Sequence, residues 1–97
     1  MASADVEIRE ALPADLPALL DLYRELQPDD PEMDEDQART RFAQMLGHPG
    51  LAVLLAISDG VAIATITLIV IPNLTRGGAP YALIENVVTA TAHRKRR

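Results

Sequence analysis

The sequence contains no cysteine and no tryptophan, and it has only two tyrosines and one phenylalanine among its 97 residues. Without cysteine the chain can have no disulfide framework, no thiolate nucleophile and no thiolate metal site, which is consistent with a reducing compartment. The scarcity of aromatic side chains predicts an aliphatic core and leaves little surface on which nucleic-acid bases could stack.

The sequence also lacks a recognisable targeting segment or membrane span. The first five residues have neither the basic region nor the apolar region of a signal peptide. The longest uncharged apolar run, Val61–Pro72, is too short to cross a bilayer. We therefore expect a cytoplasmic protein without a membrane partner.

Charge is distributed unevenly along the chain. Residues 1–93 contain all 14 acids and only five arginines, whereas Arg94–Arg97 is a run of four cations. An acidic body of this kind repels nucleic acid at long range, so a nucleic-acid partner is not expected. The length of 97 residues allows one domain, 1–97, with a modest core.

The first third of the sequence predicts a strand followed by a helix. Residues Val6–Arg9 alternate apolar and charged side chains, as in a half-buried strand. Pro13 and Pro17 suit the first turn of a helix, which ends at Gln27-Pro28. The expected apolar stripe of this helix comprises Leu16, Leu19, Leu20, Tyr23 and Leu26.

An acidic connection and a second helix are predicted next. Asp29–Asp36 holds six acids in eight residues, which predicts a mobile connection. Asp34, followed by Gln37, is typical of a helix cap, and Gly47 suits a left-handed residue at the other end. The expected helix, Glu35–Leu46, would bury Ala38, Phe42, Met45 and Leu46.

Three further strands are predicted at Leu51–Ile57, Val61–Ile71 and Tyr81–Ala90. Asp59-Gly60 favours a tight hairpin between the first two, and Asn73–Pro80 has the composition of a loop. The order β-α-α-β-β-β indicates an α+β fold, a mostly antiparallel sheet flanked by helices. The two strands before Pro72 are apolar on both faces, which predicts that both faces of the sheet are covered.

Three features of the sequence resemble the GNAT-type N-acetyltransferases. They are this order of elements, the opening Val-Glu-Ile-Arg-Glu-Ala-Leu-Pro-Ala-Asp-Leu and the strand segment Ala-Leu-Ile-Glu-Asn-Val-Val-Thr. The resemblance covers the whole chain but only the N-terminal part of the family's acyl-CoA N-acyltransferase fold. In that family the fourth strand leads into an (Arg/Gln)-x-x-Gly-x-(Gly/Ala) loop. Arg94 or Lys95 matches its first position, but neither glycine is present, so we expect a truncated domain.

The resemblance implies a reaction and a set of site residues. Acetyl-CoA would be the co-substrate, and a primary amine would accept the acetyl group. Glu85, which lies in an apolar strand where desolvation would raise its pKa, would be the catalytic base. The main chain of Val87, Val88 and Thr89 would pair with the pantetheine arm. The pyrophosphate would contact the cations Arg94, Lys95, Arg96 and Arg97.

Each of these assignments has a simpler alternative. Val87–Thr89 can be a buried strand without a ligand, and Glu85 can be a structural acid. Arg94–Arg97 can be a nucleic-acid or targeting patch, or a solvated tail. The acidic stretch Asp29–Asp36 could favour a cationic amine, or it could be only a solvated loop. His48 and His93 are too far apart in sequence to indicate a metal site.

Three hypotheses of function follow. The first is a GNAT-type N-acetyltransferase, weak or inactive as this truncated chain because the glycines of the coenzyme loop are absent. The second is a non-catalytic module that forms a homo-oligomer through the open edge of strand Tyr81–Ala90, since an apolar edge is a template for pairing. The third, a nucleic-acid module, would depend on Arg94–Arg97 alone.

Overall fold

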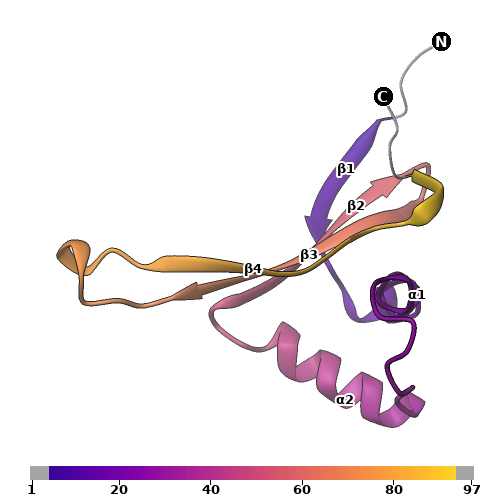
Figure 1. The fold of residues 1–97 in the computed structure, drawn as a ribbon, viewed down its shortest axis with the longest axis horizontal. Coiled ribbons are helices and arrows are strands. Elements are labelled where there is room, and N and C mark those ends of the chain that lie inside the picture. Colours follow the sequence, from indigo (N-terminus) through magenta and orange to yellow (C-terminus); the bar gives the residue numbers. More distant parts are fainter. Residues whose placement is uncertain (1–4, 94–97) are drawn as a thin grey trace.

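A four-stranded antiparallel sheet with two helices forms the fold (Figure 1), and the computed structural model describes residues 5–93. The strands lie in the order β1-β2-β3-β4, so each strand pairs with its neighbour in sequence. The predicted α+β architecture is confirmed. The elements are β1 (Val6–Glu10), α1 (Leu16–Leu26), α2 (Glu35–Leu46), β2 (Leu51–Ser58), β3 (Val61–Ile71) and β4 (Tyr81–Thr89).

Local signals explain where α2 begins. The Asp34 carboxylate accepts a 2.8 Å hydrogen bond from the Gln37 N–H, which confirms the predicted cap. The prediction of a left-handed Gly47 is wrong, because this residue stays in the right-handed region with φ −88°. Its N–H still donates to the Ala43 carbonyl at 3.0 Å, so the helical pattern continues through Gly47. Pro49 follows and cannot extend the helix.

The turn between β2 and β3 is the predicted tight hairpin. Asp59 and Gly60 both have positive φ, 52° and 77°. A two-residue turn of this kind matches the twist of the flanking strands, and aspartate and glycine tolerate it best. The hairpin brings together the two most apolar strands of the chain, whose pairing runs from Leu51 opposite Ile69 to Ser58 opposite Val61.

The core lies between the helices and one face of the sheet. Val53 and Leu55 from β2 are buried there with Leu19 from α1 and Phe42 from α2. Leu22 is also buried, although the predicted stripe of α1 omitted it, whereas Leu20 and Tyr23 are only partly buried. Helical periodicity identifies a stripe but does not set its centre, which is fixed by the packing of α1 against β3 and β4.

Both helices pack on the same face of the sheet, which corrects the expectation that both faces are covered. Helix α1 contacts β3 and β4, and α2 contacts β2. Figure 1 shows no helix of residues 5–93 on the opposite face of the sheet. The strand register places Ile8, Leu54 and Ile66 on that face. No helix in this part of the chain has the length and hydropathy needed to cross a bilayer.

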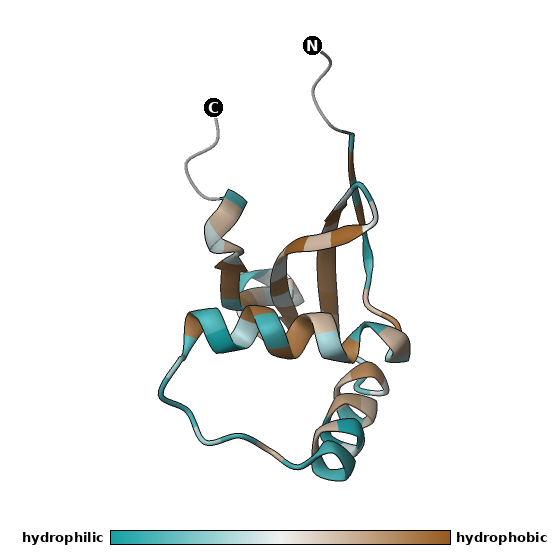
Figure 2. Cartoon of the chain, turned by 90° about the vertical axis from the view of Figure 1, so that its right-hand side faces the viewer, coloured by the Kyte–Doolittle hydropathy of each residue, from teal (hydrophilic) through white to brown (hydrophobic). Residues whose placement is uncertain are grey.

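The segment between the helices is polar and exposed (Figure 2). It includes most of the acidic stretch Asp29–Asp36, whose last two acids lie in the first turn of α2. Asp36 and Glu35 form ion pairs with Arg39, with closest N–O distances of 2.6 and 3.0 Å. These exposed pairs partly neutralise the acidic stretch and each contributes little to stability.

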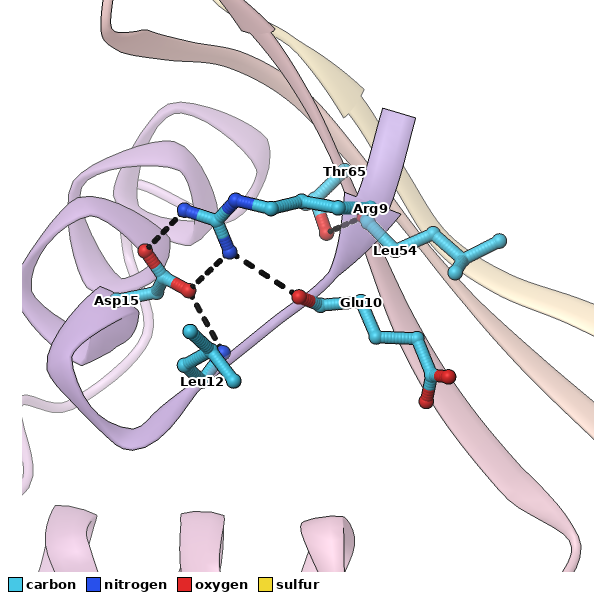
Figure 3. A network of polar contacts seen from close by, with 6 residues as sticks. All are labelled: Arg9, Glu10, Leu12, Asp15, Leu54 and Thr65. Carbon is cyan, nitrogen blue, oxygen red and sulfur yellow. Dashed lines mark hydrogen bonds and ion pairs between the residues drawn. The ribbon is translucent and has the colours of Figure 1, made fainter. Parts of the chain in front are cut away.

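An ion pair fixes β1 against the start of α1 (Figure 3). The Arg9 guanidinium donates to both carboxylate oxygens of Asp15, at 2.8 and 3.0 Å. The Asp15 carboxylate also accepts from the Leu12 N–H at 2.7 Å, so it holds the turn that connects the two elements. The hydrogen bonds from Arg9 are the main reason why the pKa of Asp15 is lowered.

We predict that Asp15→Asn destabilises the fold by about 1 kcal/mol at neutral pH, because charge-assisted hydrogen bonds are lost. Since the pKa of Asp15 is lower in the folded than in the unfolded chain, its contribution is present above pH of about 4. It disappears as the pH falls through the folded-state pKa. Urea unfolding of the native chain and of the Asp15→Asn variant, from pH 7 downwards, measures the two free energies of unfolding. Their difference should become small at low pH.

Asp21→Asn is the matched control, since Asp21 pairs with Arg24 on the exposed face of α1. It should change the free energy of unfolding only slightly at any pH. A pH-independent effect of Asp15→Asn would contradict the proposed role of the charge.

Candidate active-site strand

Strand β4 is an edge of the described sheet. It pairs with β3 on one side, and no other strand of residues 5–93 lies on its second side. Its side chains are exposed from Tyr81 to Val87, and Val87 retains 55% exposure. Val88 is different, because it is only 3% exposed and belongs to the core. Of the predicted ladder residues Val87, Val88 and Thr89, only Val88 is therefore fully buried.

A β-bulge interrupts β4 at Asn86 and Val87. Thr67 pairs with Glu85 and Thr65 pairs with Val88, so two residues of β4 lie opposite one residue of β3. Asn86 has a positive φ of 53°, a conformation that asparagine tolerates better than most residues. The bulge is a feature that periodicity did not predict. The only signal in the sequence was an asparagine within a run of strand-forming residues.

The bulge changes which side chains share a face. Glu85 and Val88 are three residues apart, but their β3 partners Thr67 and Thr65 are two apart and lie on the face that carries α1 and α2. Glu85 and Val88 therefore occupy the same face, which a regular strand would not allow. Glu85 is nevertheless exposed, so the expected desolvation by an apolar strand is wrong. An edge strand leaves its side chain open to solvent.

The chain is similar to solved structures of acetyltransferases. A protein from Agrobacterium tumefaciens str. C58, named as an acetyltransferase, is 50% identical with a TM-score of 0.88, and the match covers 92% of this chain and 62% of that one. A GNAT family acetyltransferase from Staphylococcus aureus is 22% identical with a TM-score of 0.79, covering 93% and 66%. No family model and no curated protein matches the sequence.

The chain belongs to the GNAT acetyltransferases. A third structure, an aminoglycoside N-acetyltransferase in complex with CoA, is 23% identical with a TM-score of 0.76, covering 98% of this chain and 62% of that one. This chain thus spans less than two thirds of the length of the Agrobacterium protein and of the aminoglycoside N-acetyltransferase.

A contact at the end of β4 joins this strand to α1 in the GNAT chain. The Glu25 carboxylate accepts hydrogen bonds from the N–H and the hydroxyl of Thr91, both at 2.6 Å. Thr91 begins a short 3₁₀ helix, Thr91–His93, immediately before the four cations. Sequence reasoning missed this contact because the two residues are 66 positions apart. The predicted pyrophosphate residues Arg94–Arg97 lie outside the described residues.

Two buried hydroxyl groups of the described residues have no hydrogen-bond partner. They are the phenol of Tyr23 in α1 and the hydroxyl of Thr67 in β3, which lies beside the bulge. Thr65, two positions away on the same face, donates its hydroxyl to the Leu54 carbonyl at 2.8 Å. An unpaired buried hydroxyl costs stability, whereas a paired one contributes to it.

No group of histidine, aspartate and glutamate side chains within residues 5–93 is arranged to hold a metal ion. Two hollows of the described surface lie away from β4. One of about 470 Å³ lies between α1 and α2, with Leu16, Leu20 and Ala38 along its lining. A smaller one of about 220 Å³ lies beside the acidic connection and includes Asp30 and Met33. The predicted site on β4 is therefore an exposed edge rather than an enclosed pocket.

We predict different effects on stability for two matched substitutions on β3. Thr67→Val removes an unpaired buried hydroxyl and should leave the free energy of unfolding unchanged or raise it by up to about 1 kcal/mol. Thr65→Val removes a hydrogen bond of similar burial and should lower it by about 1 kcal/mol. Urea unfolding measures both. Equal destabilisation by the two variants would show that Thr67 has a partner, such as an ordered water.

Proposed function

We propose that the chain is part of an N-acetyltransferase that transfers the acetyl group of acetyl-CoA to a primary amine. The observation that carries this proposal is the exposed edge of β4, interrupted by the bulge at Asn86 and Val87, in a chain 50% identical to a protein named as an acetyltransferase. A strand edge offers main-chain N–H and C=O groups, which suit an amide-bearing ligand such as pantetheine. The aminoglycoside N-acetyltransferase solved with CoA adds support.

The roles of individual residues are part of the proposal. Acetyl-CoA supplies the acetyl group as a thioester. The Glu85 carboxylate accepts a proton from the amine, directly or through water, as the nitrogen bonds to the acetyl carbon. The carbon–sulfur bond breaks, and CoA leaves as a thiolate that carries the electron pair of that bond. Its exposure leaves it accessible to an acceptor. The main chain of Val87–Thr89 would hold the pantetheine arm, and Arg94–Arg97 would attract the pyrophosphate.

We further propose that residues 1–97 form a single incomplete domain with weak or no activity by itself. The relatives from Agrobacterium and the CoA complex are longer, and this chain spans 62% of each. Residues 1–97 do not include either glycine of the family's coenzyme loop, so by themselves the four cations would give only diffuse attraction to phosphate. A cytoplasmic location is also part of the proposal.

A thermal-shift titration with acetyl-CoA tests the coenzyme part of this proposal. Ligand binding to the folded state raises the unfolding temperature by mass action. We expect the 97-residue chain to shift by less than about 2 °C, because half of the site is not contributed by these residues. The Agrobacterium relative, titrated in parallel, is the positive control and should be clearly stabilised. Strong stabilisation of the 97-residue chain would contradict the proposal.

A second candidate function is a non-catalytic module that dimerises through the edge of β4. The exposure of Ile84 and Val87 along that edge favours it, since unprotected apolar edges pair with other chains. Val87→Lys should then convert a dimer into a monomer, as measured by analytical ultracentrifugation. Val61→Lys, at an equally exposed site in the β2–β3 hairpin, is the control and should leave the dimer intact.

Val88 is unsuitable for this test because it is buried in the core, so a charge there would unfold the chain. A native chain that sediments as a monomer at every concentration would exclude the dimeric module.

A further inference from the structure

Strand β1 lies at the end of the strand order opposite to β4 (Figure 1). It pairs with β2 on one side, and no other strand of residues 5–93 lies on its second side. Its five side chains are exposed or only half-buried. A strand edge of this kind presents main-chain N–H and C=O groups to which a further strand can bind. The edge of β1 is therefore available for pairing within the described part of the chain.

The hydrogen bonds to β2 determine which residues of β1 face this open edge. The Ala11 N–H, directly after β1, donates to the Val53 carbonyl at 2.8 Å. In an antiparallel ladder, every second residue exchanges main-chain hydrogen bonds with the same neighbour. Since the register of β1 and β2 is regular, the main chain at the odd-numbered positions points to β2. The N–H and C=O groups of Val6, Ile8 and Glu10 therefore point to the open edge.

The side chains of β1 place opposite charges on one face of the strand. The Arg9 guanidinium reaches Asp15 at the start of α1, so the face that carries Glu7 and Arg9 is the helix face (Figure 3). Glu7 is exposed and forms no hydrogen bond or ion pair with another described residue. Ile8, between the two charges, lies on the other face and is 63% exposed.

This pattern makes the edge of β1 complementary to itself in one symmetric register. When two identical strands pair antiparallel about a twofold axis, one residue lies opposite its own copy. A pairing centred on Ile8 puts Glu7 of each copy opposite Arg9 of the other. A pairing centred on any other residue of β1 puts two like charges opposite each other, which is destabilising. The charges therefore select the register centred on Ile8.

The same register suits the main chain. Ile8 would exchange both hydrogen bonds with Ile8 of the second copy, and Val6 would exchange both with Glu10 of the second copy. Glu7 and Arg9 would then form non-hydrogen-bonded pairs, in which opposite side chains approach each other most closely. Because a guanidinium has five N–H donors, contact with a second carboxylate is compatible with the ion pair that Arg9 already makes.

We propose that β1 pairs antiparallel with β1 of a second copy of this chain, centred on Ile8, so that the two sheets join at their edges. Glu7 of each copy forms an ion pair with Arg9 of the other. The pairing lies in the plane of the sheet, so it does not depend on what covers the faces of the sheet. It also rests neither on the proposed acetyl transfer nor on the edge of β4.

The dimer should be weak and reversible. Each copy carries a formal net charge of −5, which opposes association at long range. Salt at about 0.15 M confines this repulsion to about 8 Å, so the local pairs along β1 decide the outcome. Since β1 has only five residues, its edge buries less than the roughly 1,200 Å² of a standard interface. We expect a dissociation constant of the order of 10 to 100 μM.

Analytical ultracentrifugation of the 97-residue chain over a range of concentrations tests the proposal. Glu7→Arg replaces the attraction to Arg9 of the other copy by repulsion, so the dissociation constant should rise by at least about tenfold. Glu32→Arg is the matched control, because it changes the net charge equally in the exposed segment between the helices. It should leave the dimer at least as stable as that of the native chain.

Ile8→Pro tests the main-chain part of the proposal. It removes an N–H that faces the open edge and keeps the ladder to β2, since an edge strand tolerates proline at such a position. This variant should be a monomer. In the native chain, hydrogen exchange of the Ile8 N–H should slow as the protein concentration rises. Circular dichroism and thermal unfolding establish that each variant is folded.

A mixture of two variants tests the pairing directly. Arg9→Glu alone should also weaken the dimer, because it puts carboxylates opposite each other. Mixing it with Glu7→Arg restores opposite charges at both positions, so the two variants together should associate more tightly than either alone. If Arg9→Glu does not fold because Asp15 loses its partner, Glu7→Arg and Ile8→Pro still decide the test.

Three results would overturn the inference. They are a native chain that is monomeric at every concentration, equal dissociation constants for Glu7→Arg and Glu32→Arg, or a dimer that Val87→Lys dissociates and Ile8→Pro leaves intact. The last result would assign the interface to the edge of β4. Since association is measured without coenzyme, a failure here leaves the acetyl-CoA titration as a separate test of the proposed function.

Discussion

Two helices bury one face of the sheet, and this burial positions every other element of the described chain. Val53 and Leu55 from β2 contribute the sheet side of this core, while Leu19 and Phe42 contribute the helix side. The Arg9–Asp15 ion pair holds the turn that brings α1 into place, and the Glu25–Thr91 hydrogen bonds hold the end of β4 against α1. The candidate strand is thus fixed by contacts at its C-terminal end, while no other strand of residues 5–93 pairs with its second side.

The bulge at Asn86 determines how the side chains of the candidate strand are arranged. One additional residue in β4 puts Glu85 and Val88 on the same face and leaves Val87 exposed between them. Val88 anchors the strand in the core, and Glu85 extends into solvent only three positions away. In the proposed reaction this carboxylate, beside an anchored and irregular strand edge, would accept a proton from the amine while the acetyl donor lies along that edge.

Prediction from sequence succeeded where local chemistry decides the backbone. The bounds of α2 and β3 follow from a capping carboxylate and from a run of β-branched residues, and Asp59-Gly60 determines the hairpin. Prediction failed where contacts with other parts of the fold decide the backbone conformation or the burial of a side chain. Gly47 could be left-handed but is not, and Leu22 is more deeply buried than the periodic stripe indicated. Glu85 is exposed because its strand is an edge, a property of sheet order rather than of composition.

Short-range patterns and composition suffice to predict the element order, the antiparallel pairing, the family resemblance and the acidic character of the body. The position of both helices on one face, the bulge at Asn86 and the contact between Glu25 and Thr91 became evident only in the folded chain. These features arise from contacts between residues far apart in sequence. A residue's type indicates its apolarity and its secondary-structure propensity, but not the surface against which it packs.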